Sequence, residues 1–285
     1  KMSKSKGNVI DPLDLIEKYS ADALRFTLLS MASPGTDVKL SEDRVKGYRN
    51  FLNKLWNANN FLITNECDFK DIDKVPSLNV NINKWIYSEL VETKNKIEKN
   101  LEDYRFDEAA KNAYQFAWHS YCDWYLELSK TILFSKEKNH VAEVRKTSAF
   151  IFKELLLLLH PFIPFITEEL WLKNRLGNKK NKFLMYTPWI KDIKVTKDKE
   201  ITNVNSLIDV ISKIRSFKNE LNVSPGSYID ISIKNVDKKR QNLFLKNEIV
   251  LKKLGRINSI LTEDSTNESA SLVISGEIFK NYFDK

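Results

Sequence analysis

The sequence predicts a mainly α-helical protein, an antiparallel helical bundle followed by a small C-terminal α+β module. Two observations carry this prediction. From about residue 41 to residue 173, apolar residues recur at helical spacing in successive segments joined by short polar connections. After about residue 200 the pattern changes to helix, strand, helix, strand, which is typical of a small α+β unit. At 285 residues, the chain is long enough for about two domains.

Composition narrows the class of protein. The 42% hydrophobic and 11% aromatic content is that of a chain with a real core, and no apolar run reaches 18 residues, so no membrane span is expected. The two cysteines, Cys67 and Cys122, lie far apart without metal-ligand spacing, which argues against a disulfide framework or a zinc site and favours the cytoplasm. The net charge of +8 favours an anionic partner.

The first elements are two short helices between residues 11 and 31. Asp11 is expected to cap the first, with Pro12 at its first position, and Ser20 to cap the second. Asp22 then falls in the first turn of the second helix, where the helix dipole favours a negative charge. The stretch from Ala32 to Thr36 reads as a turn and a domain boundary.

A long helix is expected to start near Ser41, because one continuous apolar face follows at spacings of three and four residues. This face consists of Val45, Tyr48, Leu52, Leu55, Asn59 and Leu62. The other faces of the helix carry several asparagines and the basic residues Arg44, Lys46, Arg49 and Lys54. A polar connection over residues 65–82 follows it.

The same spacing predicts helices over residues 83–101, 106–134 and 141–159, and Pro164 begins a last helix of the bundle. The lysine-rich stretch 177–200 is interpreted as a solvated linker rather than a dedicated RNA contact. Beyond it we expect a helix over 204–214, a strand at Ile229–Ile233, a helix over 243–254 and a strand at Leu272–Ile274. No Ser-His-Asp order, catalytic carboxylate pair or metal-ligand spacing stands out, and His119 is interpreted as structural.

The chain opens on Lys1-Met2-Ser3-Lys4-Ser5-Lys6-Gly7-Asn8, a lysine cluster that must stay in water or meet anions. KMSKS followed by KGNVIDP resembles the signature loop of class I aminoacyl-tRNA synthetases. The resemblance implies an ATP-binding loop formed by Lys1, Met2, Ser3, Lys4 and Ser5. It also implies that Lys4 is catalytic and stabilises charge on the pyrophosphate of ATP, with Mg²⁺, in the full-length enzyme.

Further stretches resemble the valyl-tRNA synthetase family. They are YRNFLNKLWNA at 48–58, CDWYLE at 122–127, HPFIPFITEELW at 160–171 and IRSFKNELNVSPG at 214–226. The isoleucyl and leucyl enzymes share the third stretch and remain alternatives. The resemblance implies that Lys54 faces the tRNA anticodon and that Phe61 offers its ring to an anticodon base, with Arg44 of the same helix as a third candidate. A solvated Lys54 and a core role for Phe61 remain open.

The expected organisation is residues 1–34 as the signature loop and the end of a catalytic domain, 35–176 as an anticodon-binding bundle, 177–200 as a basic linker and 201–285 as the α+β module. The nucleotide-binding half and the valine pocket are not in this chain. We therefore expect the C-terminal part of a larger, monomeric enzyme that joins valine to its tRNA with ATP through valyl-adenylate. Alone, this part is expected to hold no ATP and to be inactive.

Two other classes of function are rivals to this interpretation. The first is a stand-alone, non-catalytic RNA-binding helical protein. The second is a helical scaffold that binds proteins. The two differ in salt dependence, because phosphate contacts make RNA binding salt-sensitive.

Overall fold

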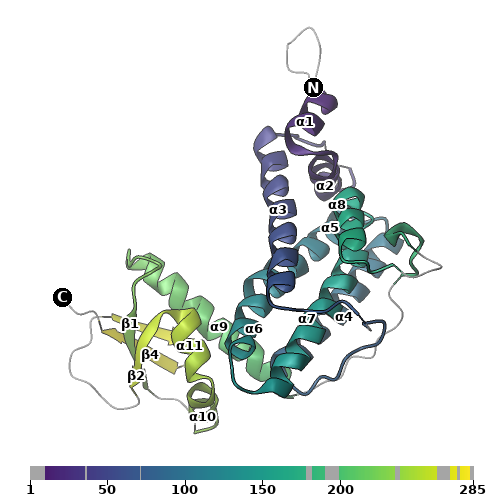
Figure 1. Ribbon diagram of the computed structural model, residues 1–285. Helices are drawn as coiled ribbons and strands as arrows, with labels where there is room; N and C mark the ends of the chain where they lie inside the picture. Colours follow the sequence, from purple (N-terminus) through teal and green to yellow (C-terminus); the bar gives the residue numbers. More distant parts are fainter. Residues whose placement is uncertain are drawn as a thin grey trace. The chain divides into compact units, whose positions relative to one another are not determined.

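The chain forms two compact units in the computed structural model, Lys1–Thr196 and Lys197–Lys285. The structure describes residues 10–35, 37–70, 72–177, 182–189, 199–234, 238–261, 270–274 and 277–282. The first unit is helical and the second combines helices with a sheet (Figure 1). The predicted fold class, a mainly helical bundle with a small α+β module, is confirmed.

The first unit is built from successive helices joined by short turns and by the connection 65–80. Its elements are α1 (Pro12–Tyr19), α2 (Ala21–Met31), α3 (Glu42–Thr64), α4 (Asn81–Glu102), α5 (Phe106–Gln115), the π-helix η2 (Phe116–Tyr125), α6 (Leu126–Leu133), α7 (Lys138–Leu159), α8 (Pro164–Lys173) and the short 3₁₀-helix η3 (Leu184–Tyr186).

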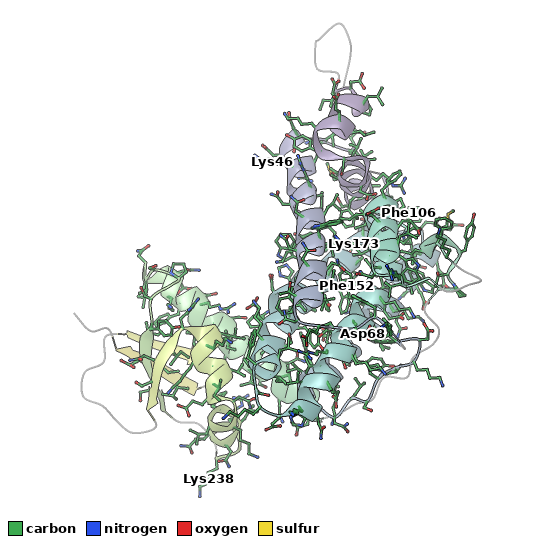
Figure 2. All side chains as sticks on the ribbon, in the orientation of Figure 1. Lys46, Asp68, Phe106, Phe152, Lys173 and Lys238 are labelled. Carbon is green, nitrogen blue, oxygen red and sulfur yellow. The ribbon has the colours of Figure 1, made fainter. Side chains whose placement is uncertain are left out.

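Helix α7 is the centre of this unit. Every residue from Thr147 to Leu159 is buried, and α7 packs against α3, α4, α5, α6 and α8. A helix that is apolar on all sides is stable only when neighbours surround it. Figure 2 shows the contrast between Phe152, inside the bundle, and Lys46, which stands away from the other helices of the unit. Among the described residues, no helix is long and apolar enough to cross a membrane.

Two of the expected helix caps are present. The Asp11 carboxylate accepts a hydrogen bond from the Leu13 backbone N–H at 2.8 Å, and the Ser20 hydroxyl accepts one from Ala23 at 3.3 Å. Asp22 has a further role that the sequence did not indicate. It is buried, and its carboxylate accepts hydrogen bonds from the first-turn N–H groups of α8, Phe165 at 3.2 Å and Ile166 at 2.6 Å. Asp22 therefore ties α2 to the start of α8.

The prediction of one continuous α-helix over 106–134 is wrong in its middle. Residues Phe116–Tyr125 form a π-helix, in which hydrogen bonds run from residue i to i+5. Buried positions here recur at intervals of five, as at Phe116, Tyr121 and Leu126. A π-turn keeps such positions on one face, whereas an α-helix would spread them. Tyr121 and Tyr125 secure the segment by donating to the Ser148 carbonyl oxygen at 3.0 Å and to Asn83 Oδ1 at 2.8 Å.

In its described residues, the second unit is a four-stranded sheet with three helices. Its elements are α9 (Lys199–Glu220), β1 (Ile229–Lys234), α10 (Lys238–Lys246), α11 (Glu248–Gly255), β2 (Ile257–Leu261), β3 (Ala270–Ile274) and β4 (Glu277–Tyr282). The strand order is β2-β1-β4-β3. Strand β1 pairs with β2 in parallel and with β4 antiparallel, and β3 pairs with β4 antiparallel.

The expected strands at 229–233 and 272–274 are present, but β2 and β4 were not predicted. The expected helix over 243–254 is two helices that meet at Asn247. There the Asn247 side-chain amide donates to the Leu243 carbonyl oxygen at 2.9 Å. Asparagine competes in this way with the backbone for helical hydrogen bonds, which explains the break between α10 and α11.

Candidate functional site

Helix α3 has a buried face and an exposed one. The expected apolar face is confirmed, with Tyr48 half-buried and the rest of it buried. The opposite side carries basic groups and amides that point to solvent. We call these exposed residues the polar face of α3: Lys46, Arg49, Asn50, Asn53, Asn57 and Asn60. Asparagine amides both donate and accept hydrogen bonds, as recognition of base edges requires.

Lys54 lies at the edge of this face and is held on two sides. Its ammonium group pairs with the Asp123 carboxylate and sits 3.8 Å from the centre of the Trp118 ring. The Lys54 side chain is 26% exposed and that of Asp123 is 38% exposed. Lys54 is thus not a freely solvated lysine. We refer to Asp123 and Trp118 as the Lys54 clamp.

The π-helix explains how both clamp residues reach one lysine. Trp118 and Asp123 are five residues apart, and in an α-helix they would point about 140° away from each other. In a π-helix this separation is only a little more than one turn, so both side chains can face α3. Behind them, the ring of Tyr114 stacks on Trp118 with centroids 5.6 Å apart. His119 is 60% exposed, with Nδ1 3.3 Å from the second oxygen of the Asp123 carboxylate.

Phe61 is half-buried and lies two turns beyond Lys54 on the same side of α3. The Lys130 ammonium of α6 lies 5.5 Å from the centre of its ring, and Lys130 also pairs with Glu127 at 2.5 Å. The structure therefore places Lys54 and Phe61 along one line, beside cationic and aromatic groups of η2 and α6. Phe61 is only partly in the core and keeps part of its surface exposed.

Arg44 is exposed, but it lies neither on the polar face nor on the line formed by Lys54 and Phe61. It precedes Lys54 by ten residues, about 15 Å along the helix axis, and at about 100° per residue it points roughly a quarter turn away. The three predicted anticodon contacts are thus on one helix, and only two of them share a side.

The predicted ATP-binding residues Lys1, Met2, Ser3, Lys4 and Ser5 lie outside the described residues. Most of the predicted linker does too. In its described segment 182–189 most residues are exposed, but two of them are anchored to the helices. Leu184 is buried and its N–H donates to the Glu168 carboxylate at 2.9 Å, while the Trp189 indole donates to Glu98 at 2.7 Å. The apolar residues between the lysines account for this packing.

Other catalytic chemistry is not supported in the described part of the chain. No group of three or more His, Cys, Asp or Glu side chains there is placed to hold a metal ion. Burial raises the pKa of Cys67 and of Cys122 to about 12 in each case, so neither thiol is a ready nucleophile. Trp171 and Cys122 are core residues, and Trp124 is half-buried.

Sequence reasoning missed Trp118, Asp123 and Lys130 as partners of the candidate residues. The stretch WHSYCDWYLELSK contains them, but a helix of period 3.6 places Trp118 on a different face from Asp123 and Lys130. Only spacing at intervals of five could have pointed to the arrangement that the structure shows.

The comparisons with known proteins concern the family and the fold. The family described as "Anticodon-binding domain of tRNA ligase" matches residues 83–233, just over half of the chain. Residues 1–41 match the family described as "tRNA synthetases class I (I, L, M and V)".

The similar curated proteins are valine–tRNA ligases. That of Pelagibacter ubique is 69% identical over 285 residues, which cover 100% of this chain and 32% of that protein. That of Mesorhizobium japonicum is 39% identical over 278 residues, covering 97% of this chain and 30% of that protein. The chain thus spans about a third of the length of the curated relatives it matches.

Two solved structures share the fold. One is the agnB2 LeuRS of Agrobacterium radiobacter K84 in a ternary complex with tRNA and LeuAMS. It has a TM-score of 0.52 at 23% identity, covering 67% of this chain and 22% of that one. The other is the Mycobacterium tuberculosis methionyl-tRNA synthetase in complex with methionyl-adenylate. It has a TM-score of 0.52 at 18% identity, covering 64% and 37%. By its domain match and its relatives, the chain belongs to the anticodon-binding-domain family of class I tRNA ligases.

Proposed function

We propose that this chain is the tRNA-binding part of a valine–tRNA ligase, and that α3 with η2 and α6 contacts the anticodon loop. The observation that supports it most directly is the line formed by Lys54 and Phe61, with the Lys54 clamp and Lys130 beside it. The identity of 69% to a valine–tRNA ligase supports valine over isoleucine or leucine.

The chemistry of this line suits unstacked bases. Anticodon bases are single-stranded, so a protein can bind them by stacking and by hydrogen bonds to their edges. The exposed part of the Phe61 ring offers a stacking surface, worth about 1–3 kcal/mol per base. A Lys54 held in place by Asp123 and Trp118 presents its remaining donors in a fixed direction, which lowers the entropy cost of binding.

In the whole enzyme we propose the established chemistry of the class: valine and ATP, with Mg²⁺, give valyl-adenylate and pyrophosphate, and the valyl group is then transferred to tRNA with release of AMP. Lys4 would stabilise the charge on the pyrophosphate, with Lys1 as a secondary phosphate contact, and Met2, Ser3 and Ser5 would complete the ATP-binding loop. We also propose that the enzyme is monomeric and acts in the cytoplasm. The chain alone is expected to give only background valine-dependent pyrophosphate exchange, and exchange near the rate of a whole synthetase would contradict this part of the proposal.

Binding of labelled valine tRNA to the full 285-residue chain tests the function. Fluorescence anisotropy at several salt concentrations should show binding whose log affinity falls linearly with log salt, because phosphate contacts release counterions. Isoleucine tRNA should bind more weakly. An absence of tRNA binding, or binding without salt dependence, would favour the protein-binding scaffold instead.

Variants of α3 and matched control variants test which surface of the chain binds the tRNA. Phe61→Ala should weaken binding by about 5- to 150-fold, the equivalent of one lost stacked base, and Lys54→Ala should also weaken it. As controls, Tyr104→Ala removes an exposed aromatic residue and Lys96→Ala an exposed lysine of α4, both away from α3. If these controls lower affinity as much as the α3 variants do, α3 is not the contact surface.

A further inference from the structure

The second unit contains a positively charged pocket that the proposed anticodon contact does not use. It has a volume of about 300 Å³ and lies where the ends of α9 and α11 meet the turn before β1. Its lining residues are Arg215, Lys218, Asn219, Pro225, Leu254, Gly255 and Arg256. Three of these described lining residues are basic and none is acidic.

Each basic group is fixed by the fold. The Arg215 guanidinium donates twice to the Leu254 carbonyl oxygen, at 3.0 and 2.8 Å, at the end of α11. The Lys218 ammonium donates to the Ser227 carbonyl oxygen at 2.5 Å, and only 2% of Lys218 is exposed. Arg256, in a left-handed conformation with φ of 54°, donates to the Tyr228 hydroxyl at 3.0 Å. The three charges are therefore preorganised.

Helix dipoles alone do not account for three cations at this place. The C-terminal end of a helix carries roughly half a negative charge, so α9 and α11 together offer roughly one. The three basic side chains exceed this by roughly two positive charges. This excess of positive charge acts on Lys218. Burial lowers the pKa of Lys218, and the charges of Arg256 and Arg215 lower it further. An anion placed among them would relieve this repulsion.

We propose that the Arg215–Lys218–Arg256 pocket binds a phosphate group, and that in the complex with tRNA the RNA backbone supplies it. The remaining N–H groups of two guanidiniums and one ammonium are the donors that phosphate oxygens accept most strongly. The RNA part rests on the proposed function. It adds a second contact, on a unit distinct from the anticodon-binding surface.

The test uses the full chain with two independent measurements. In the first, valine tRNA affinity is measured against salt for the wild type, Arg256→Gln, Arg256→Lys and the control Lys246→Gln, which removes an exposed charge of α10. Arg256→Gln should weaken binding about three- to tenfold at low salt and reduce the salt slope by about one. Arg256→Lys should retain most of the affinity, and Lys246→Gln should stay within about twofold.

The second measurement titrates inorganic phosphate against chloride at equal ionic strength and follows the side-chain Nε–H resonances of Arg215 and Arg256 by NMR. If these resonances shift saturably with phosphate but not with chloride, the pocket binds phosphate, whatever the tRNA result. Shifts without an effect of Arg256→Gln on tRNA would assign the pocket to a free phosphate compound and overturn the RNA part. No shifts and no effect would overturn the proposal. A wild type that binds phosphate but not tRNA would refute the proposed function while upholding the pocket.

Discussion

At the scale of single residues, Lys54 is a partly exposed lysine whose ammonium group is held in one direction by its neighbours. The Asp123 carboxylate offsets its charge and the Trp118 ring limits its movement. Because Lys54 and Asp123 are both partly exposed, the pair itself should add at most about 1 kcal/mol to stability. The larger effect of the pair is that it fixes the position of the Lys54 ammonium group.

The positional role predicts the effect of Asp123→Asn. We expect tRNA affinity to fall about three- to tenfold, because the amide holds the ammonium less firmly and Lys54 samples more conformations. A double-mutant cycle with Lys54→Ala measures the coupling. If Asp123 acts through Lys54, Asp123→Asn should have little further effect once Lys54 is alanine. Additive losses would show that Asp123 acts by another route.

Glu154 predicts a pH dependence of stability. Burial raises its pKa from 4.5 to about 7. Below pH 4.5 the carboxyl is protonated in both states, and between pH 4.5 and 7 the folded chain keeps a proton that the unfolded chain releases. Stability attributable to this group therefore falls as pH rises through this window, by up to about 3 kcal/mol.

Glu154→Gln should remove this dependence, so that the variant unfolds at higher urea concentration than the wild type at pH 8 and the difference shrinks toward pH 5. Glu169→Gln, at an exposed position of α8, is the control and should leave the urea midpoint nearly unchanged at both pH values. A Glu154→Gln effect that does not vary with pH would contradict the assignment.

The resemblance to a known family singled out Lys54, which lies in the stretch 48–58, and Phe61, which follows that stretch on the same helix. It could not supply Asp123 or Lys130 as their partners, since these contacts join residues about 69 positions apart along the chain. Local patterns carry no information on which helix faces which.

At the scale of elements, the helices with regular apolar spacing were predictable and the irregular ones were not. The face from Val45 to Leu62 predicted α3 because its spacing of three and four matches an α-helix. Helix η2 was missed because its buried residues recur at intervals of five, and β2 and β4 because short strands offer little periodic signal. The π-helix is also the element that builds the Lys54 clamp.

The link between α2 and α8 gives a prediction at this scale. Asp22→Ala removes the acceptor of two N–H groups at the start of α8, so the free energy of unfolding should fall by about 1–2 kcal/mol, as for the loss of a helix cap. Urea denaturation measures it. Asp14→Ala, in the exposed first turn of α1, should change it by less than about 0.5 kcal/mol. Equal effects of the two substitutions would argue against a capping role for Asp22.

At the scale of the whole molecule, the charge of +8 is spread over two units with different proposed tasks. The polar face of α3 and the line from Lys54 to Phe61 lie in the first unit, and the Arg215–Lys218–Arg256 pocket lies in the second. A tRNA is long enough to be contacted at separate places, and linked contacts raise overall affinity well above that of either alone.

The central claim is that α3 recognises the anticodon, and a comparison of two tRNAs tests it. Affinity is measured for valine tRNA and for the same tRNA with its anticodon bases replaced. The wild-type chain should prefer the natural anticodon, and the Lys54→Ala/Phe61→Ala variant should bind both tRNAs equally and more weakly. A variant that keeps the wild-type preference would contradict the assignment of α3 as the recognition surface.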